Sequence, residues 1–259
     1  MNNPNLYAGL YNAIRDSYFN YLRFGDRSEK KLKPLHGWIG NTISSFIPKE
    51  RYDVYFLNGK EVQTEGEYYK KMIDVAIVKK DVEVIEKKVG LKKVFYIPKI
   101  EMAISIKFIT SNFKQNANNY FENLLGECAN LRARGIKFGH FVIFRDRMPY
   151  FERSKKIKRW EILEDCDINK YIKLFKEREK FSHAPNVIEL EIINIDPIIE
   201  KFYERKSKFT EEEIKEVIGK GRFVIQNGID NTNLSKETKR FILDNFNLQQ
   251  FFTNIKEIL

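Results

Sequence analysis

The sequence predicts an α/β (α+β) protein in which a mixed β-sheet is flanked by helices, with an additional helical region towards the C-terminus. Three apolar segments rich in β-branched or aromatic residues, at 72–78, 101–110 and 139–144, are typical of buried strands. Between the last two, residues 114–134 carry an apolar stripe at helical spacing and end before Gly135. This strand–helix–strand order indicates a sheet covered by helices.

The elements before the first of these strands follow from local signals. Apolar residues spaced by four indicate a helix, and an Asn-Gly pair after an alternating segment is a strong hairpin signal. The expected elements are a helix at 4–24, a second helical stretch broken or kinked at 35–41 and running to Ile47, a strand at 52–57 that returns after Asn58-Gly59 through 65–69 into the strand at 72–78, and a hairpin around Gly90 within residues 79–93.

Beyond residue 145 the same rules predict alternating helices and a strand, with capping residues at several helix starts. We expect residues 1–160 to form the core with its N-terminal helices, and residues 161–259 to form a C-terminal α/β extension, either separate or part of the same domain. The extension is expected to hold a helix at 167–180, a strand at 187–195, a helix opened by Asp196-Pro197, and capped helices starting at Thr210 and Ser235.

Two of the buried strands carry polar residues where apolar ones are expected. Asp74 stands between Ile73 and Val75 in the first strand. Because side chains alternate along a strand, Ser105 and Lys107 share one face of the second strand. A charge in such a position needs a partner or a metal.

Asp74 together with Ser105-x-Lys107 resembles the active site of the PD-(D/E)xK nucleases, the superfamily that holds most type II restriction endonucleases. In that pattern, an aspartate on one strand and an (acid)-x-Lys on the next meet at a divalent metal. This sequence departs from it twice, because Ile73 replaces the proline and Ser105 replaces the second acid. Some restriction enzymes have Ser-x-Lys and supply the acid from the following helix. The resemblance covers residues 74–144 and implies a restriction-endonuclease-like core.

Three glutamates are candidates for the missing acid. If the strand ends near residue 110 and the helix starts near Lys114, about 10 Å of strand and about 10 Å of returning helix place Glu122 level with Lys107. Glu127 would overshoot by nearly 8 Å, and Glu101 lies roughly 20 Å away along the strand. We therefore expect Glu122 first, Glu127 second and Glu101 third. A solvated carboxylate on the helix surface is an equally good interpretation of Glu122.

The resemblance implies a Mg²⁺-dependent endodeoxyribonuclease, in the first place a type II restriction enzyme that cuts a short duplex sequence. Asp74 and Glu122 would hold Mg²⁺, Lys107 would orient the attacking water or neutralise charge on the phosphate, and Ser105 would be a hydrogen-bonding filler. A homodimer and a cognate DNA methyltransferase as genetic partner are further implications. Two alternatives remain: a repair or recombination nuclease of the same fold, and a DNA-binding module without catalysis.

Charge agrees with a double-stranded DNA partner. The formal net charge is +10 and the pI is near 9.3, which suits polyanions, although an AT-rich genome that favours lysine codons explains the same composition. The densest basic run, at 145–159, is interleaved with aromatic residues; a solvated surface loop is the alternative interpretation. The amide side chains that follow Lys114, at the start of the expected helix, could equally well cap the helix or form turns. The candidate DNA contacts are Lys114, Gln115, Asn116, Asn118, Asn119, Arg145, Arg147, Lys155, Lys156, Lys158 and Arg159.

Several classes of protein are disfavoured. Cys128 and Cys166 make neither a disulfide framework nor a zinc site, and the three histidines are scattered. The sequence has no phosphate-binding G-x-x-x-x-G-K-[ST] loop. Neither an export signal nor an apolar run of about 20 residues is visible, so we expect a soluble, cytoplasmic protein without a membrane partner.

Overall fold

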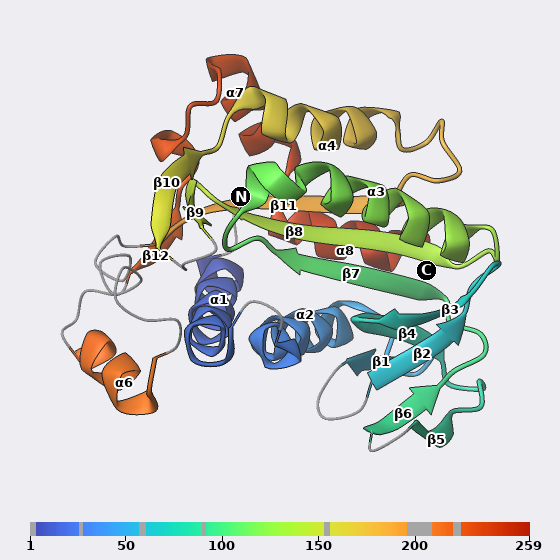
Figure 1. The fold of residues 1–259 in the computed structure, drawn as a ribbon. Coiled ribbons are helices and arrows are strands. Elements are labelled where there is room, and N and C mark those ends of the chain that lie inside the picture. The colour runs from blue at the N-terminus through green and yellow to red at the C-terminus, as the bar shows by residue number, and fades with distance from the viewer. Residues whose placement is uncertain are drawn as a thin grey trace.

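A six-stranded mixed sheet forms the centre of the molecule (Figure 1). The structure, a computed structural model, describes residues 4–25, 28–56, 61–89, 92–152, 156–195, 209–219 and 224–259. The two contacts of β8 with β7 and β11 are parallel, and the other contacts are antiparallel. In spatial order the strands are β1 (Tyr52–Phe56), β4 (Val75–Lys79), β7 (Met102–Phe108), β8 (Lys137–Arg145), β11 (Val187–Ile195) and β12 (Ile225–Asn227).

Helices cover both faces of this sheet, so the predicted fold class is confirmed (Figure 1). One face packs on α1 (Pro4–Phe24), α2 (Lys33–Phe46) and α8 (Leu248–Ile258), and the other on α3 (Phe113–Arg132), α4 (Asp165–Glu177) and α7 (Lys236–Asn245). Because α3 connects the parallel neighbours β7 and β8, it must run back along the sheet. This crossover is the element order that the resemblance implied.

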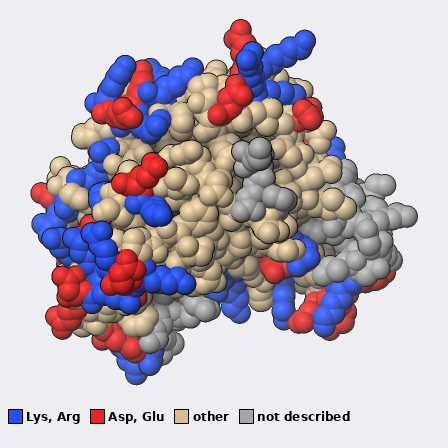
Figure 2. All heavy atoms as spheres, turned by 180° about the vertical axis from the view of Figure 1, so that it is seen from behind, with Lys and Arg blue, Asp and Glu red and all other residues tan. Residues whose placement is uncertain are grey.

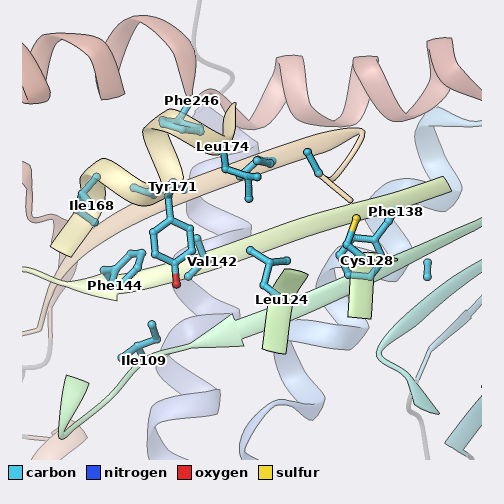
Figure 3. Packing of buried hydrophobic residues seen from close by; sticks show 14 of the residues in the cluster. Ile109, Leu124, Cys128, Phe138, Val142, Phe144, Ile168, Tyr171, Leu174 and Phe246 are labelled. Atoms are coloured by element: carbon cyan, nitrogen blue, oxygen red, sulfur yellow. The ribbon is translucent and has the colours of Figure 1, made fainter. Parts of the chain in front are cut away.

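The alternation predicted for β7 places its residues on two separate cores. Ile104 and Ile106 pack on the α1 and α2 side, whereas Ala103 packs on the α3 side. Figure 3 shows the second core, where Cys128 of α3 and Tyr171 of α4 lie over β8. The Tyr171 ring meets that of Phe144 edge-on, with ring centroids 5.4 Å apart. Burying a large apolar side chain contributes about 1.5–3 kcal/mol, so these contacts hold α3 and α4 in place.

A second sheet lies beside the first and corrects two expectations. Its strands, in spatial order, are β3 (Lys70–Ile73), β2 (Glu61–Glu65), β6 (Lys92–Tyr96) and β5 (Ile85–Val89). The segment expected as one strand at 72–78 is two strands, β3 and β4, which join different sheets and meet at Asp74. The expected pairing of the strand at 52–57 with the returning chain is wrong, because β1 pairs with β4. Residues 57–60 lie outside the described residues; the β5–β6 hairpin is confirmed.

The expected break at 35–41 is also wrong, because α2 runs through it. Gly40 in its middle faces the ring of Phe56, and a Cβ there would collide with that ring. The glycine therefore serves a close helix–strand contact rather than a helix end. The short 3₁₀ turn η1 (Glu29–Lys31) precedes α2.

The C-terminal half adds both to the central sheet and to its helices. The helices expected at 167–180 and from Ser235 are α4 and α7, and the strand at 187–195 is β11. The Thr210 cap precedes α6 (Glu211–Gly219). The basic run instead forms a hairpin, β9 (Arg147–Phe151) and β10 (Ile157–Ile162), and the turn η3 (Ile229–Asn231) follows β12.

The pairing of β11 with β8 favours the single-domain alternative for residues 161–259. The helix expected from Asp196-Pro197 lies outside the described residues. In the part of the chain that is described, none of the helices combines the length and apolarity that crossing a bilayer requires.

Candidate active site

The site lies where β4 separates from β7. Their pairing ends at Val75 and Ile104, so the next residues of β7 have a free edge. The Asp74 carboxylate occupies this edge, and its Oδ2 accepts a hydrogen bond of 2.7 Å from the backbone N–H of Ile106. Because the N–H and C=O of one residue point to the same side of a strand, the Ile106 carbonyl faces the same gap. The irregularity that interrupts the sheet thus places Asp74 beside the centre of β7.

Glu127 of α3 lies across from Asp74, on the Ser105 face of β7. Its Oε2 accepts a hydrogen bond of 3.3 Å from the Ser105 hydroxyl, and its Oε1 lies 2.7 Å from the Lys71 ammonium. The side chain of Glu127 is only 12% exposed, so the charge needs such partners. Ser105 is therefore a hydrogen-bond donor to the helix-borne acid.

These side chains line one small pocket. Its volume is about 40 Å³, enough for a small ion with a few water molecules, and its polar lining residues include Lys71, Asp74, Ser105, Lys107 and Glu127. The structure therefore brings together the three residues of the motif and one of the three candidate acids.

Lys71 was not among the residues expected from sequence. It belongs to β3, three residues before Asp74, and the turn from one sheet to the other carries it into the pocket. Only its basic side chain near Asp74 could have suggested it, and lysines are common throughout this chain.

Two buried histidines border the site without adding positive charge. His36 of α2 has its Nε2 3.9 Å from Asp74 Oδ1, and burial lowers its pKa. His140 faces Ser105 across the β7–β8 pair; burial, with a smaller effect of the Lys107 charge, lowers its pKa to about 3. Both imidazoles are therefore neutral near pH 7, and the cations of the pocket are the two lysines.

The acid that the structure places in the pocket is Glu127, the second choice, and not Glu122. Residues 105–112 advance by about 23 Å and helix residues 113–127 return by about 21 Å, which brings Glu127 back to Ser105. Glu122 is exposed and lies about 140° around the helix axis from Glu127. The regular strand ends at Phe108, but the chain runs on to Asn112 before α3 begins, which is later than the expected end at residue 110. Glu101 lies at the far end of β7, where it pairs with Lys79 at 3.1 Å.

Of the candidate DNA contacts at the start of α3, some side chains are exposed and others already bind to groups of this chain. Gln115, Asn118 and Asn119 are exposed. The amide of Asn116 donates to the Asn112 carbonyl within the first turn, which is not a helix-capping hydrogen bond. The ammonium of Lys114 lies 2.6 Å from a carboxylate oxygen of Glu164.

The basic residues at 145–159 also differ in their exposure. Arg145 is fully buried beside the Tyr18 ring and cannot reach a phosphate, so its expected DNA contact is wrong. Arg147 lies half-buried over the ring of Trp160. Arg159 pairs with Glu161 at 2.9 Å, yet its side chain remains 54% exposed. Lys156 and Lys158 are exposed on the hairpin, and Lys155 lies outside the described residues.

The net charge does not form a single basic surface on the face drawn in Figure 2. There, the Lys and Arg side chains of the described residues gather mostly towards the periphery, close to Asp and Glu, and the described residues in the middle are mainly of other types. On this face, the described charges therefore do not mark a site for a polyanion.

A second group of possible ligand atoms comes from Glu164, Cys166 and Asp167 at the start of α4. Helix capping accounts for it. The Asp167 carboxylate accepts from the Glu164 N–H at 3.0 Å, and Glu164 is already paired with Lys114. Asp74 and Glu127, in the pocket, have no helix-capping role of this kind.

Comparisons with known proteins give distant likenesses. No protein-family model matches the sequence, and no curated protein matches it significantly. Among solved structures, the chain is similar to Pseudomonas aeruginosa ATCC27853 NucC in its cAAA-bound form, with 10% identity, 93% of this chain and 87% of that chain covered, and a TM-score of 0.39. It is also similar to Escherichia coli MS115-1 NucC in its cAAA-bound form, with 11% identity, 93% of this chain and 86% of that chain covered, and a TM-score of 0.38. The apo form of the same protein gives 12% identity, covers 97% of this chain and 92% of that chain, and has a TM-score of 0.34. TM-scores this low carry no weight for function.

Proposed function

We propose that this chain is a divalent-metal-dependent nuclease that hydrolyses phosphodiester bonds of double-stranded DNA. One observation carries the proposal: Asp74, Ser105, Lys107 and a helix-borne glutamate, Glu127, line the same pocket. It supports the resemblance, in which an aspartate, a lysine and an acid from the following helix act together.

The donor atoms in this pocket fit a hard divalent cation. Asp74 and Glu127 supply carboxylate oxygens, the Ile106 carbonyl faces the same gap, and the lining includes neither cysteine nor histidine. We propose Mg²⁺, held by Asp74 and Glu127. The metal, when bound, polarises the scissile phosphate and lowers the pKa of the attacking water.

The chain's own residues account for the remaining chemistry. Lys107 lies on the same face of β7 as Ser105, and its ammonium stabilises the negative charge that develops on the phosphate or orients the attacking water. The Ser105 hydroxyl holds Glu127 in position, and the Ile106 N–H holds Asp74. The Lys71 ammonium neutralises the charge of Glu127 in the present arrangement.

The finer proposal is a type II restriction endonuclease that cuts at a short specific sequence. It acts as a homodimer, since a palindromic site asks for two-fold protein symmetry, and a DNA methyltransferase is its genetic partner. Discrete fragments from plasmid cleavage would support this specificity, whereas cutting only at flaps, ends or lesions would support a repair nuclease.

The decisive experiment incubates the full chain with plasmid DNA and Mg²⁺, with and without EDTA. We expect metal-dependent cutting that Asp74→Ala and Lys107→Ala each lower by about 100-fold or more, because both act on the transition state. DNA binding in Ca²⁺ should be retained by both variants. Glu122→Gln is the matched control and should cut normally. Full cleavage by folded Lys107→Ala protein, or DNA binding without cutting, would contradict the proposal.

A further inference from the structure

A second pocket, of about 260 Å³, opens at the β11 edge of the central sheet. It exists because β12 pairs only with residues 193–195, which leaves the preceding part of β11 without a neighbouring strand on that side. Helices α1 and α7 and the turn η3 supply its walls. The lining residues that matter below are Tyr7, Tyr11, Glu191, Asn227, Ile229 and Phe246.

Glu191 is the unusual member of this lining. Its side chain belongs to a residue only 6% exposed, and within the described part of the chain its Oε1 has no hydrogen-bond partner. Glu189, two positions away on the same face of β11, is 1% exposed and has an unpartnered Oε1 as well. A buried polar atom without a partner is destabilising by about 1–3 kcal/mol. The Glu191 carboxyl oxygen is therefore available to a ligand that carries a positively charged donor.

Burial acts on the protonation of both acids. It raises the pKa of Glu191 to about 8, and it raises that of Glu189 well above its usual value, with the neighbouring Glu191 charge as a second cause. Without a cation, Glu191 is therefore largely protonated near pH 7. A bound cation would favour the ionised form, and the carboxyl would release its proton to solvent.

The other walls suit a cation with an apolar body. The rings of Tyr7 and Tyr11, both on α1, have centroids 6.1 Å apart and line the pocket. Burial raises the pKa of both phenols, that of Tyr11 to about 12. They are neutral aromatic faces, which attract cations. Ile229 and Phe246 add apolar surface. Since a cavity of about 150 Å³ holds a benzene ring, this pocket has room for one ring and a short polar group.

We propose that this pocket binds a small organic cation, an amine or amidinium carried on a single ring, through the Glu191 carboxylate and the faces of Tyr7 and Tyr11. The site is separate from the pocket of Asp74 and Glu127, and its test measures binding rather than cleavage. Its outcome is therefore independent of the proposed function.

The test compares benzamidine with benzamide, which has nearly the same shape but no charge, by calorimetry on the full chain. At pH 8 we expect benzamidine to bind about tenfold more tightly or better, because its hydrogen bonds to Glu191 are charge-assisted. Its affinity should fall from pH 8 to pH 6, since Glu191 must then give up a proton. The other titratable groups facing the pocket are Glu189 of β11 and Tyr7 and Tyr11 of α1.

Variants locate the effect. Glu191→Gln should remove the preference for benzamidine, while Asp244→Asn, on the exposed side of α7, should keep it. The proposal is overturned if benzamidine shows no saturable binding, if the two probes bind the wild-type chain equally, or if Glu191→Gln keeps the preference. The comparison of probes on the wild-type chain decides the matter even if Glu191→Gln does not fold.

Discussion

At the scale of single residues, the position of Glu127 depends on where the chain turns. Ile109 still donates to the Ile143 carbonyl and Asn112 to the Pro149 carbonyl, so the chain continues past the regular strand before α3 begins. Asn112 has a φ of 50°, a left-handed conformation that asparagine tolerates better than most residues. The late turn brings Glu127 back to Ser105.

We predict that Glu127→Gln loses metal-dependent cutting, whereas Glu122→Gln and Glu101→Gln keep most of it. The amide removes a charged oxygen ligand but preserves shape, so a loss of about 100-fold in rate is expected. Single-turnover cleavage of plasmid DNA across Mg²⁺ concentrations measures this. An active Glu127→Gln beside an inactive Glu122→Gln would place the metal on the other face of α3.

A second residue-level prediction concerns Lys71. Its ammonium lies 2.7 Å from Glu127 and competes with any cation for that carboxylate. Lys71→Met should therefore bind Mn²⁺ several-fold more tightly than the wild-type chain, whereas Glu127→Gln should bind it more weakly. Calorimetry with Mn²⁺ and no DNA gives both values. Equal Mn²⁺ affinity in wild type and Lys71→Met would show that this ion pair does not compete with the metal.

At the scale of elements, the β9–β10 hairpin is tied to the site. The Asn112 side chain accepts a hydrogen bond of 2.7 Å from the Phe151 N–H, between the end of β7 and the hairpin. Lys156 and Lys158 are exposed on the same hairpin. A basic element held next to the β7–α3 turn is well placed to contact DNA that reaches the site, and this supports the contacts expected from sequence there.

We predict that neutralising Lys155, Lys156, Lys158 and Arg159 weakens DNA binding nearly equally for all duplex sequences. Each lost phosphate contact should flatten the slope of log affinity against log salt by about 0.9. Titrations in Ca²⁺ across salt concentrations measure the slope, and the exposed pair Lys87 and Lys88 on β5 is the control. An unchanged slope would favour a solvated hairpin, and a loss at one sequence only would favour base reading.

At the scale of the whole molecule, the buried acids of β11 tie folding to pH. The Glu191 carboxyl has its usual pKa of about 4.5 in the unfolded chain and about 8 in the folded one. Between these values the folded chain holds a proton that the unfolded chain has released. The stability contribution is therefore complete below pH 4.5 and is lost as the pH rises through about 8.

We predict that, from pH 5 to pH 8, the free energy of unfolding of the wild-type chain falls relative to that of Glu191→Gln. The buried His36 and His140, whose pKa values are lowered, act in the opposite direction in both proteins and cancel in this comparison. One proton corresponds to about 1.4 kcal/mol per pH unit, and Glu189 acts in the same direction. Urea unfolding at several pH values, with Asp244→Asn as control, measures the difference. A steeper fall in Glu191→Gln than in wild type would contradict the protonated state of this carboxyl.

The sequence by itself determined the strands at β7, β8 and β11, the helices α1, α3, α4 and α7, and the Asp74 and Ser105-x-Lys107 residues of the site. These depend on local spacing: alternation places Ser105 and Lys107 on one face, and an apolar stripe defines α3. Such patterns are properties of neighbouring residues, so they can be read without a partner segment.

Only the tertiary structure decided which acid joins the site and which strands pair. The choice of Glu127 over Glu122 depends on the length of the turn before α3, and the role of Lys71 depends on the passage of the chain from one sheet to the other at Asp74. The pocket of Glu191 depends on β12 pairing with only part of β11. Each is a contact between segments distant in sequence, where packing, and not local propensity, selects the partner.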